Sequence, residues 1–89
     1  MQIEIRKSAI KDLKQISEPY RTKIHNKILE LKKFPNLQNI KKLTNFEPAY
    51  RLRIGDYRVL FDVENEFIII GRVLHRKERY KNLKRKSKN

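Results

Sequence analysis

Residues 50–80, YRLRIGDYRVLFDVENEFIIIGRVLHRKERY, contain the clearest structural pattern in the chain and decide its predicted fold. The first five residues alternate in polarity, so their apolar side chains fall on one face of a strand and Arg51 and Arg53 fall on the other. This stretch therefore predicts a strand with one oily face and one cationic face.

The pattern continues through two turns and two further strands. The Gly-Asp pair at 55–56 is typical of a tight turn, and residues 57–63 then alternate again, which places Arg58 on the same face as the first two arginines. Residues 64–66 predict a second turn. The run at 67–74 is rich in isoleucine and valine, as in a strand buried on both faces.

Upstream of this meander, residues 1–6 alternate like a short half-buried strand. Ser8 is the predicted N-cap of a helix that runs through residue 16, and Pro19 is the predicted first residue of a second helix that ends near residue 33. The second helix has an inward stripe that begins with Tyr20, which we expect in the core. With so short a break between them, the helices are expected to form an antiparallel hairpin, and residues 37–48 a connection.

The order of elements predicts an α+β fold, β-α-α-β-β-β, in which the N-terminal strand joins a mainly antiparallel four-stranded sheet. The helical hairpin covers one face of this sheet, and the face that carries the arginines is left open. Eighty-nine residues make one domain, expected to span residues 1–83 and to be followed by a flexible basic tail at 84–89.

The amino-acid composition limits the classes of binding partner and cofactor that are expected. The formal net charge is +13, with 23 lysines and arginines against 10 acidic residues, which favours a polyanionic partner such as a nucleic acid or an acidic protein. The chain has no cysteine, and no cluster of histidines and carboxylates has the spacing of metal ligands, so neither a metal nor a cofactor is expected. Without a long apolar run or a signal peptide, a cytoplasmic location is the expectation.

The motifs YRLRIGDYRVLF at 50–61 and HRKERY at 75–80, together with the preceding helices, resemble those of the RelE/ParE toxin superfamily, RelE branch, over residues 1–83. The resemblance implies a toxin of a type II toxin–antitoxin system that enters the ribosomal A site and cleaves mRNA there. By the same resemblance, the cleavage uses no metal and proceeds by attack of a ribose 2′-hydroxyl on the adjacent phosphate. The resemblance also implies an antitoxin that wraps and inhibits the toxin, and the high positive charge predicts that this partner is acidic, partly disordered and helical when bound.

Such a reaction needs a base for the 2′-hydroxyl, positive charge for the transition state and an acid for the leaving 5′-oxygen. Arginine suits the second task because its planar guanidinium donates paired hydrogen bonds to phosphate. By the resemblance, Arg51 and Arg53 lie near the scissile phosphate, Arg58 stabilises the transition state and Arg76 assists the leaving group. Tyr80 matches the C-terminal tyrosine of the family, which stacks on a base or helps to activate the nucleophile, although its spacing from Arg76 is shorter here.

Other residues complete the candidate site. His75 is a further candidate acid or base, since imidazole titrates near neutral pH, and Glu47 is an additional candidate base. His25 is expected at the surface of the second helix. The candidates for contact with the RNA backbone are Lys41, Lys42, Lys77, Arg79 and Lys81.

Two other functions remain open at this point. A ParE-like toxin with the same fold inhibits DNA gyrase and has no need of an arginine cluster directed at phosphate. A chain that has lost its catalysis would only bind RNA or its partner protein, and each arginine would then be an ordinary solvated residue on a strand. The type of damage separates the first two functions, because the nuclease stops translation and the gyrase inhibitor induces a DNA-damage response. In a chain without catalysis, Arg58→Ala leaves growth inhibition unchanged, or no inhibition occurs.

Overall fold

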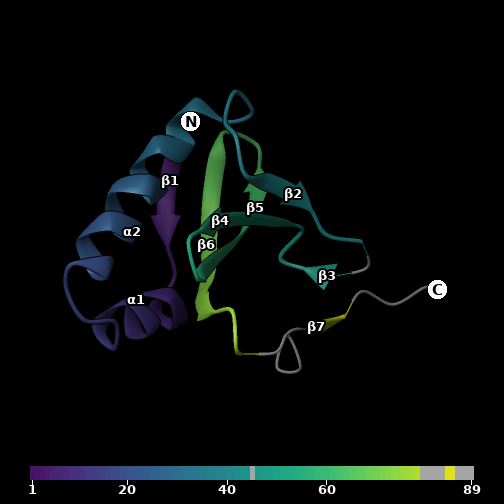
Figure 1. Cartoon of the computed structure of the whole chain (residues 1–89). Coiled ribbons are helices and arrows are strands. Elements are labelled where there is room, and N and C mark those ends of the chain that lie inside the picture. The colour runs from purple at the N-terminus through teal and green to yellow at the C-terminus, as the bar shows by residue number, and fades with distance from the viewer. Residues whose placement is uncertain (45, 79–83, 86–89) are drawn as a thin grey trace.

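The computed structural model describes residues 1–44, 46–78 and 84–85, which form an α+β domain with two helices on one side of a sheet (Figure 1). In chain order the elements are β1 (Gln2–Ile5), α1 (Lys7–Lys14), α2 (Tyr20–Glu30), the short 3-10 helix η1 (Leu31–Lys33), β2 (Ile40–Lys42), β3 (Phe46–Glu47), β4 (Tyr50–Ile54), β5 (Tyr57–Glu64), β6 (Phe67–His75) and β7 (Lys84–Arg85). The predicted fold class is confirmed.

The main sheet has five strands in the order β1-β6-β5-β4-β2, one more than the sequence predicted. Strand β1 runs parallel to β6, and the other neighbours are antiparallel. The additional strand is β2, in the stretch expected to be an irregular connection. It pairs with β4 because Ile40 lies opposite Leu52 and adds an apolar side chain to the edge of the core. Three residues are too short for an alternating pattern to be recognised.

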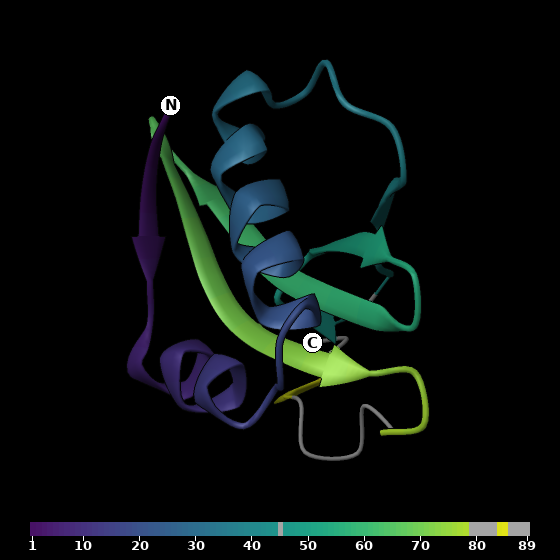
Figure 2. The same cartoon turned by 60° about the vertical axis from the view of Figure 1, so that its left-hand side comes forward.

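The core lies between the helices and one face of the sheet (Figure 2). The helices contribute apolar side chains to it at helical spacing, and a T-shaped contact between Phe34 and Phe61, with ring centroids 5.9 Å apart, closes one end. The buried members from the helices are Ala9, Leu13, Ile16, Ile24, Ile28 and Leu31, and those from the strands are Leu52, Ile54, Val59, Phe61, Ile68, Ile70 and Val73. Tyr20 was expected here, but 53% of it is exposed.

The helices differ from the predicted antiparallel hairpin in how they lie. Helix α1 lies across one end of α2 in both views, where a hairpin would place the two side by side (Figures 1 and 2). Ser8 does not cap α1, because the helix begins at Lys7 and the Ser8 hydroxyl donates to the carbonyl of Gly71, 2.6 Å away. The hydroxyl that was expected to cap the helix therefore binds the backbone of β6.

The face of the sheet away from the helices is only partly open. Leu60, Ile69 and Leu74 lie on that face and are buried. Strands β3 and β7 pair on this side of the main sheet (Figure 1), and Pro48 lies so close to Gly71 that a Cβ added there would be 3.0 Å from the proline Cγ. The arginine-bearing end is thus the open part of a face that was expected to be open throughout.

Both predicted turns are present. Gly55 has φ +56°, in the left-handed region that glycine enters without strain, and Asn65 occupies the second turn with φ +55°. Lys84 and Arg85, expected in a flexible tail, pair with β3, and residues 86–89 lie outside the described part of the chain. In that part, neither helix has the length and apolar character that a bilayer span requires.

Candidate nucleic-acid interface

A row of basic side chains crosses β2, β4 and β5 on the face away from the helices. Arg53 lies directly opposite Arg58, and Arg51 lies directly opposite Lys41. Paired residues of antiparallel strands share a face, so these four side chains project from the same surface. We call them the basic cluster. The three arginines were predicted to share this face, whereas Lys41 joins it only because β2 forms.

Backbone carbonyls of the β4–β5 turn hold Arg58. Its Nη1 donates to the carbonyl of Gly55 at 2.9 Å and to that of Tyr57 at 3.1 Å. Both contacts hold the guanidinium at the β4–β5 turn, at one end of the sheet. The turn thus positions Arg58, to which the family resemblance assigns stabilisation of the transition state.

Arg51 and Arg53 differ in exposure. Arg53 is exposed, whereas Arg51 is half-buried and its Nε is shielded from solvent without a hydrogen-bond partner. Neither arginine forms an ion pair within the described residues. Like charges placed directly opposite each other on adjacent strands are destabilising, so the Arg53–Arg58 pair carries a cost that a bound anion would remove.

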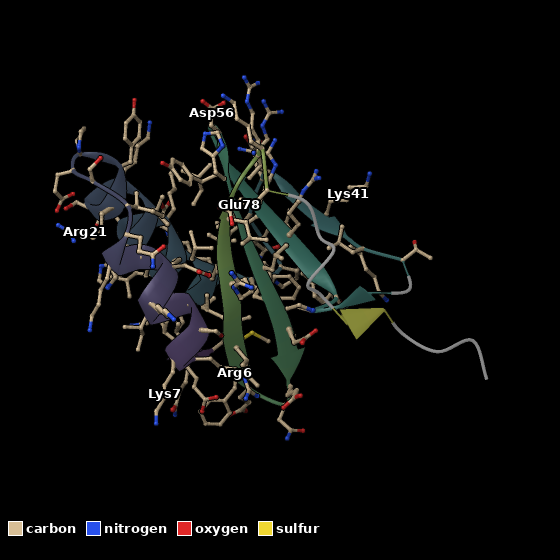
Figure 3. All side chains as sticks on the ribbon, turned by 90° about the horizontal axis from the view of Figure 1, so that it is seen from below. Arg6, Lys7, Arg21, Lys41, Asp56 and Glu78 are labelled. Atoms are coloured by element: carbon tan, nitrogen blue, oxygen red, sulfur yellow. The ribbon has the colours of Figure 1, made fainter. Side chains whose placement is uncertain are left out.

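Arg76 reaches the same end of the sheet from β6. Its backbone N–H donates to the carbonyl of Asp56 at 2.6 Å, and its Nε lies 3.6 Å from the Asp56 carboxylate. In Figure 3, Asp56 lies at the end opposite Arg6 and Lys7, beside a group of side chains that end in nitrogen. Sequence reasoning treated Asp56 as a simple turn residue, although the Gly-Asp turn anchors both Arg58 and Arg76.

His75 projects from the opposite face. It pairs with Tyr57, whose side chain packs toward the core, and the two rings form a T-shaped contact with centroids 5.2 Å apart. Its Nδ1 accepts the backbone N–H of Lys77 at 3.2 Å, and Glu78 closes the same turn by accepting the His75 N–H at 2.9 Å. The structure therefore does not bring His75 into the basic cluster.

The other residues predicted to contact RNA also differ in where they lie, and most of them are outside the basic cluster or outside the described residues. Lys42 is exposed but pairs with Tyr50, so it projects from the helix side of the sheet, and Lys77 is exposed in the turn after β6. His25 is exposed on α2 as expected. Arg79, Tyr80 and Lys81 lie outside the described residues, as does the side chain of Glu47. Among the described residues, no three histidine or carboxylate side chains gather as metal ligands would.

Comparison with known proteins decides the family. Residues 3–80 match the family model of the ParE toxin of type II toxin–antitoxin systems, parDE. The chain belongs to this toxin family. It is 36% identical over 84 residues to toxin RelE3 of Methanocaldococcus jannaschii, covering 90% of this chain and 96% of the relative. It is also 35% identical over 85 residues to the putative toxin RelE1 of the same organism, covering 90% and 94%.

Solved structures of RelE toxins share the fold of this toxin. The RelB–RelE antitoxin–toxin complex from Methanococcus jannaschii superposes with a TM-score of 0.70 at 34% identity, over 82% of this chain and 89% of that one. The isolated Escherichia coli RelE toxin gives 0.69 at 18% identity, over 91% and 88%, a likeness that concerns the fold alone. The RelE-like character predicted from the motifs is confirmed.

Proposed function

We propose that this toxin is a metal-independent endoribonuclease that cleaves mRNA in the ribosomal A site. The observation that carries the proposal is the cross-strand pair Arg53–Arg58, flanked by Arg51 and Lys41 on one open surface. Four cations fixed by strand pairing form a preorganised site for a phosphate whose negative charge grows during reaction. Kinship with RelE toxins supports the same reading.

In the proposed reaction the 2′-oxygen forms a bond to the adjacent phosphorus and the bond from phosphorus to the 5′-oxygen breaks. The products are a 2′,3′-cyclic phosphate and a 5′-hydroxyl. A base takes the proton of the 2′-hydroxyl, and an acid supplies one to the leaving oxygen. Arg58 and Arg53 neutralise the non-bridging oxygens, Arg51 and Lys41 hold the neighbouring backbone, and Arg76 stabilises the leaving group.

The proton-transfer residues are proposed from the resemblance. Tyr80 is proposed to help activate the nucleophile or to stack on a base. His75 serves as acid or base only if the RNA passes around the end of the sheet, since its ring lies on the helix side. Lys77, Arg79 and Lys81 are proposed as supporting contacts to RNA phosphates, and Lys42, which projects from the helix side of the sheet, is left out of this set.

The proposed partner is a cognate antitoxin, an acidic and partly disordered chain that becomes helical when bound. Two observations support it: the net charge of +13, and the crystallisation of RelE relatives as complexes with RelB. An acidic partner neutralises a surface whose own charges repel one another. The corresponding test is copurification from strains with and without the adjacent reading frame, and a fully soluble, harmless solitary protein in the strain that lacks this frame contradicts the proposal.

The deciding experiment is induced expression in bacteria of the wild type, Arg58→Ala and the control Arg6→Ala, followed by primer extension on a defined translated mRNA. Arg6 is exposed and lies at the other end of the sheet (Figure 3), so its substitution removes the same charge far from the basic cluster. We expect codon-phased cleavage in the wild type and Arg6→Ala, and a loss of at least a hundredfold in Arg58→Ala. Intact mRNA during growth arrest contradicts the nuclease.

A second candidate is inhibition of DNA gyrase, favoured by the ParE description of the matching family model. Such a toxin binds a protein and induces a DNA-damage response without cleaving mRNA. Growth arrest with this response and intact transcripts selects it. Absence of arrest in every strain indicates a chain that only binds RNA or its partner.

A further inference from the structure

A cavity opens at the same end of the sheet as the basic cluster, but on the helix side. Its volume is about 250 Å³, and it lies between the start of α2, the β4–β5 turn and the end of β6. A cavity of about 150 Å³ is enough to hold a benzene ring, so this one has room for a larger planar ring. The side chains that give it chemical character are Tyr20, Lys23, Asp56, Tyr57 and His75.

Three aromatic rings form its wall. Tyr20 and Tyr57 are tilted by 41° with centroids 6.0 Å apart, and His75 meets Tyr57 edge-on at 5.2 Å. Tyr57 is half-buried, whereas Tyr20 is 53% exposed although it begins the inward stripe of α2. Because Tyr20 and Tyr57 already touch, a ligand ring stacks on the uncovered part of Tyr20 and does not enter between them.

The polar groups around the rings suit a nucleobase. The His75 Nδ1 accepts the Lys77 N–H, so the neutral ring carries its proton on Nε2 and presents a donor. The Asp56 carboxylate is an acceptor, and Lys23 supplies a positive charge for a phosphate. A donor, an acceptor, an aromatic surface and a cation together match an unpaired nucleotide.

The cavity is joined to the basic cluster through one turn. Gly55 and Asp56 line the cavity, and the same two residues accept hydrogen bonds from Arg58 and Arg76. Gly55 and Lys23 also border a larger groove of about 640 Å³ that follows α2 past Lys27 and reaches Arg53. Lys23 and Arg53 both line this groove, and its other charged side chains, Lys27 and Glu30, form an ion pair. A single strand held by the arginines thus has a path from one face of the sheet to the other.

We propose that this cavity binds an unpaired nucleobase of the RNA strand next to the phosphate held by Arg53 and Arg58. The proposal rests on the proposed function, since it names a substrate contact of the same enzyme. Tyr20 is the stacking surface, His75 and Asp56 contact the edge of the base, and Lys23 contacts its phosphate. It explains why a large aromatic side chain of the core stripe remains exposed.

The test has a binding arm and a cleavage arm. In the binding arm the purified full-length chain is titrated with AMP, GMP, CMP or UMP, and with ribose 5-phosphate as the probe without a base, while the Tyr20 and His75 ring signals are followed by NMR. Tyr20→Phe keeps the stacking ring, whereas Tyr20→Leu keeps apolar volume without one. Because Tyr20 is half-exposed, all three proteins are expected to fold.

We expect at least one mononucleotide to bind the wild type and Tyr20→Phe about tenfold more tightly than Tyr20→Leu, and ribose 5-phosphate to leave the Tyr20 signals unchanged. Equal binding by the Leu variant, or equal effects of ribose 5-phosphate, overturns the proposal. So does absence of nucleotide binding combined with loss of antitoxin binding in Tyr20→Leu, since the cavity then receives a protein side chain.

In the cleavage arm, programmed ribosomes carry mRNAs that differ only in the bases beside the cleaved phosphate. We expect Tyr20→Leu to lower kcat/KM about tenfold and to flatten the dependence on the neighbouring base. If Tyr20→Leu cleaves as fast as the wild type and with the same dependence on the neighbouring base, the proposed base pocket is contradicted and the proposed nuclease activity is supported. If mononucleotides bind in the cavity but neither the wild type nor a variant cleaves mRNA, the base pocket is supported and the nuclease activity is contradicted.

Discussion

Asp12 on α1 and Arg72 on β6 form a bidentate ion pair at the edge of the sheet. Arg72 donates from Nε at 2.8 Å and from Nη2 at 3.1 Å, and the same carboxylate accepts the backbone N–H of Val73 at 2.9 Å. Strand β1 ends at Ile5, so beyond that point α1 takes the place of a neighbouring strand along β6. The hydrogen bonds from Arg72 to Asp12 raise the pKa of the guanidinium.

Replacement of Asp12 by alanine is expected to lower the free energy of unfolding by about 2–3 kcal/mol, because it leaves the partly buried Arg72 and the Val73 N–H without an acceptor. Urea denaturation measures the change. The control is Glu30→Ala, which breaks the exposed Lys27–Glu30 pair and should cost less than about 0.5 kcal/mol. Equal losses in the two variants would show that Asp12 is an ordinary surface charge.

This edge illustrates what the sequence predicts and what it does not. Alternation over five to seven residues predicted β4, β5 and the shared face of the three arginines, and a run rich in isoleucine and valine predicted β6, because both signals are local. The partner of Asp12 lies 60 residues away, and no local pattern predicts it. Strand β2 is too short for a periodic signal, so the placement of Lys41 beside Arg51 could not be read from the sequence.

Tyr20 was expected in the core and is exposed, and His75 was a candidate acid or base whose place in the site was open. Each has its own structural reason. Periodicity places Tyr20 on the inward stripe of α2, but its ring contacts Tyr57 at the start of β5 and remains 53% exposed. For His75, the bulge in β6 matters. Leu60 pairs with Arg72 and Phe61 with Ile70, so Gly71 has no partner and the alternation reverses beyond it. Counting by twos across the bulge assigns each later side chain to the wrong face.

The bulge gives a test of packing between Gly71 and Pro48. A Cβ at position 71 would approach the Pro48 Cγ to 3.0 Å, so Gly71→Ala should lose about 1 kcal/mol by crowding against the proline. In a Pro48→Ala background the same change should be neutral or stabilising, because alanine restricts the unfolded chain. Thermal or urea unfolding of the four proteins gives the coupling energy, and a coupling near zero contradicts the contact.

The start of α2 is expected to be sensitive to acid. The pKa of Glu18 is lowered, first by the backbone N–H of Thr22 and then by its hydroxyl, with Arg21 adding a smaller effect. A lowered folded-state pKa means that the stabilisation is present above the ordinary value of 4.5 and is lost as the pH falls through the folded value. Glu18→Gln should therefore lower Tm at pH 7, and the difference from the wild type should shrink toward pH 3.

Thr22→Val provides the control for this pH effect. It removes the hydroxyl that contacts both oxygens of Glu18 but keeps the backbone N–H, so it should retain part of the pH-dependent difference in Tm. A gap between wild type and Glu18→Gln that stays constant from pH 7 to pH 3 would mean that the carboxylate charge does not stabilise the helix.

Lys41 and Lys42 offer a matched test of which face of the sheet meets RNA. Both are exposed and adjacent in β2, but Lys41 pairs with Arg51 in the basic cluster and Lys42 pairs with Tyr50 on the helix side. Their alanine variants lose the same charge, so any difference between them arises from position. We expect Lys41→Ala to weaken binding of a single-stranded RNA several-fold and to reduce the slope of log affinity against log salt by about 0.7, the value for one phosphate contact.

Lys42→Ala should leave both quantities near those of the wild type in fluorescence anisotropy titrations between 50 and 200 mM salt. Equal losses in the two variants would mean that RNA responds to the net charge of the toxin, and the basic cluster would then have no special role in binding.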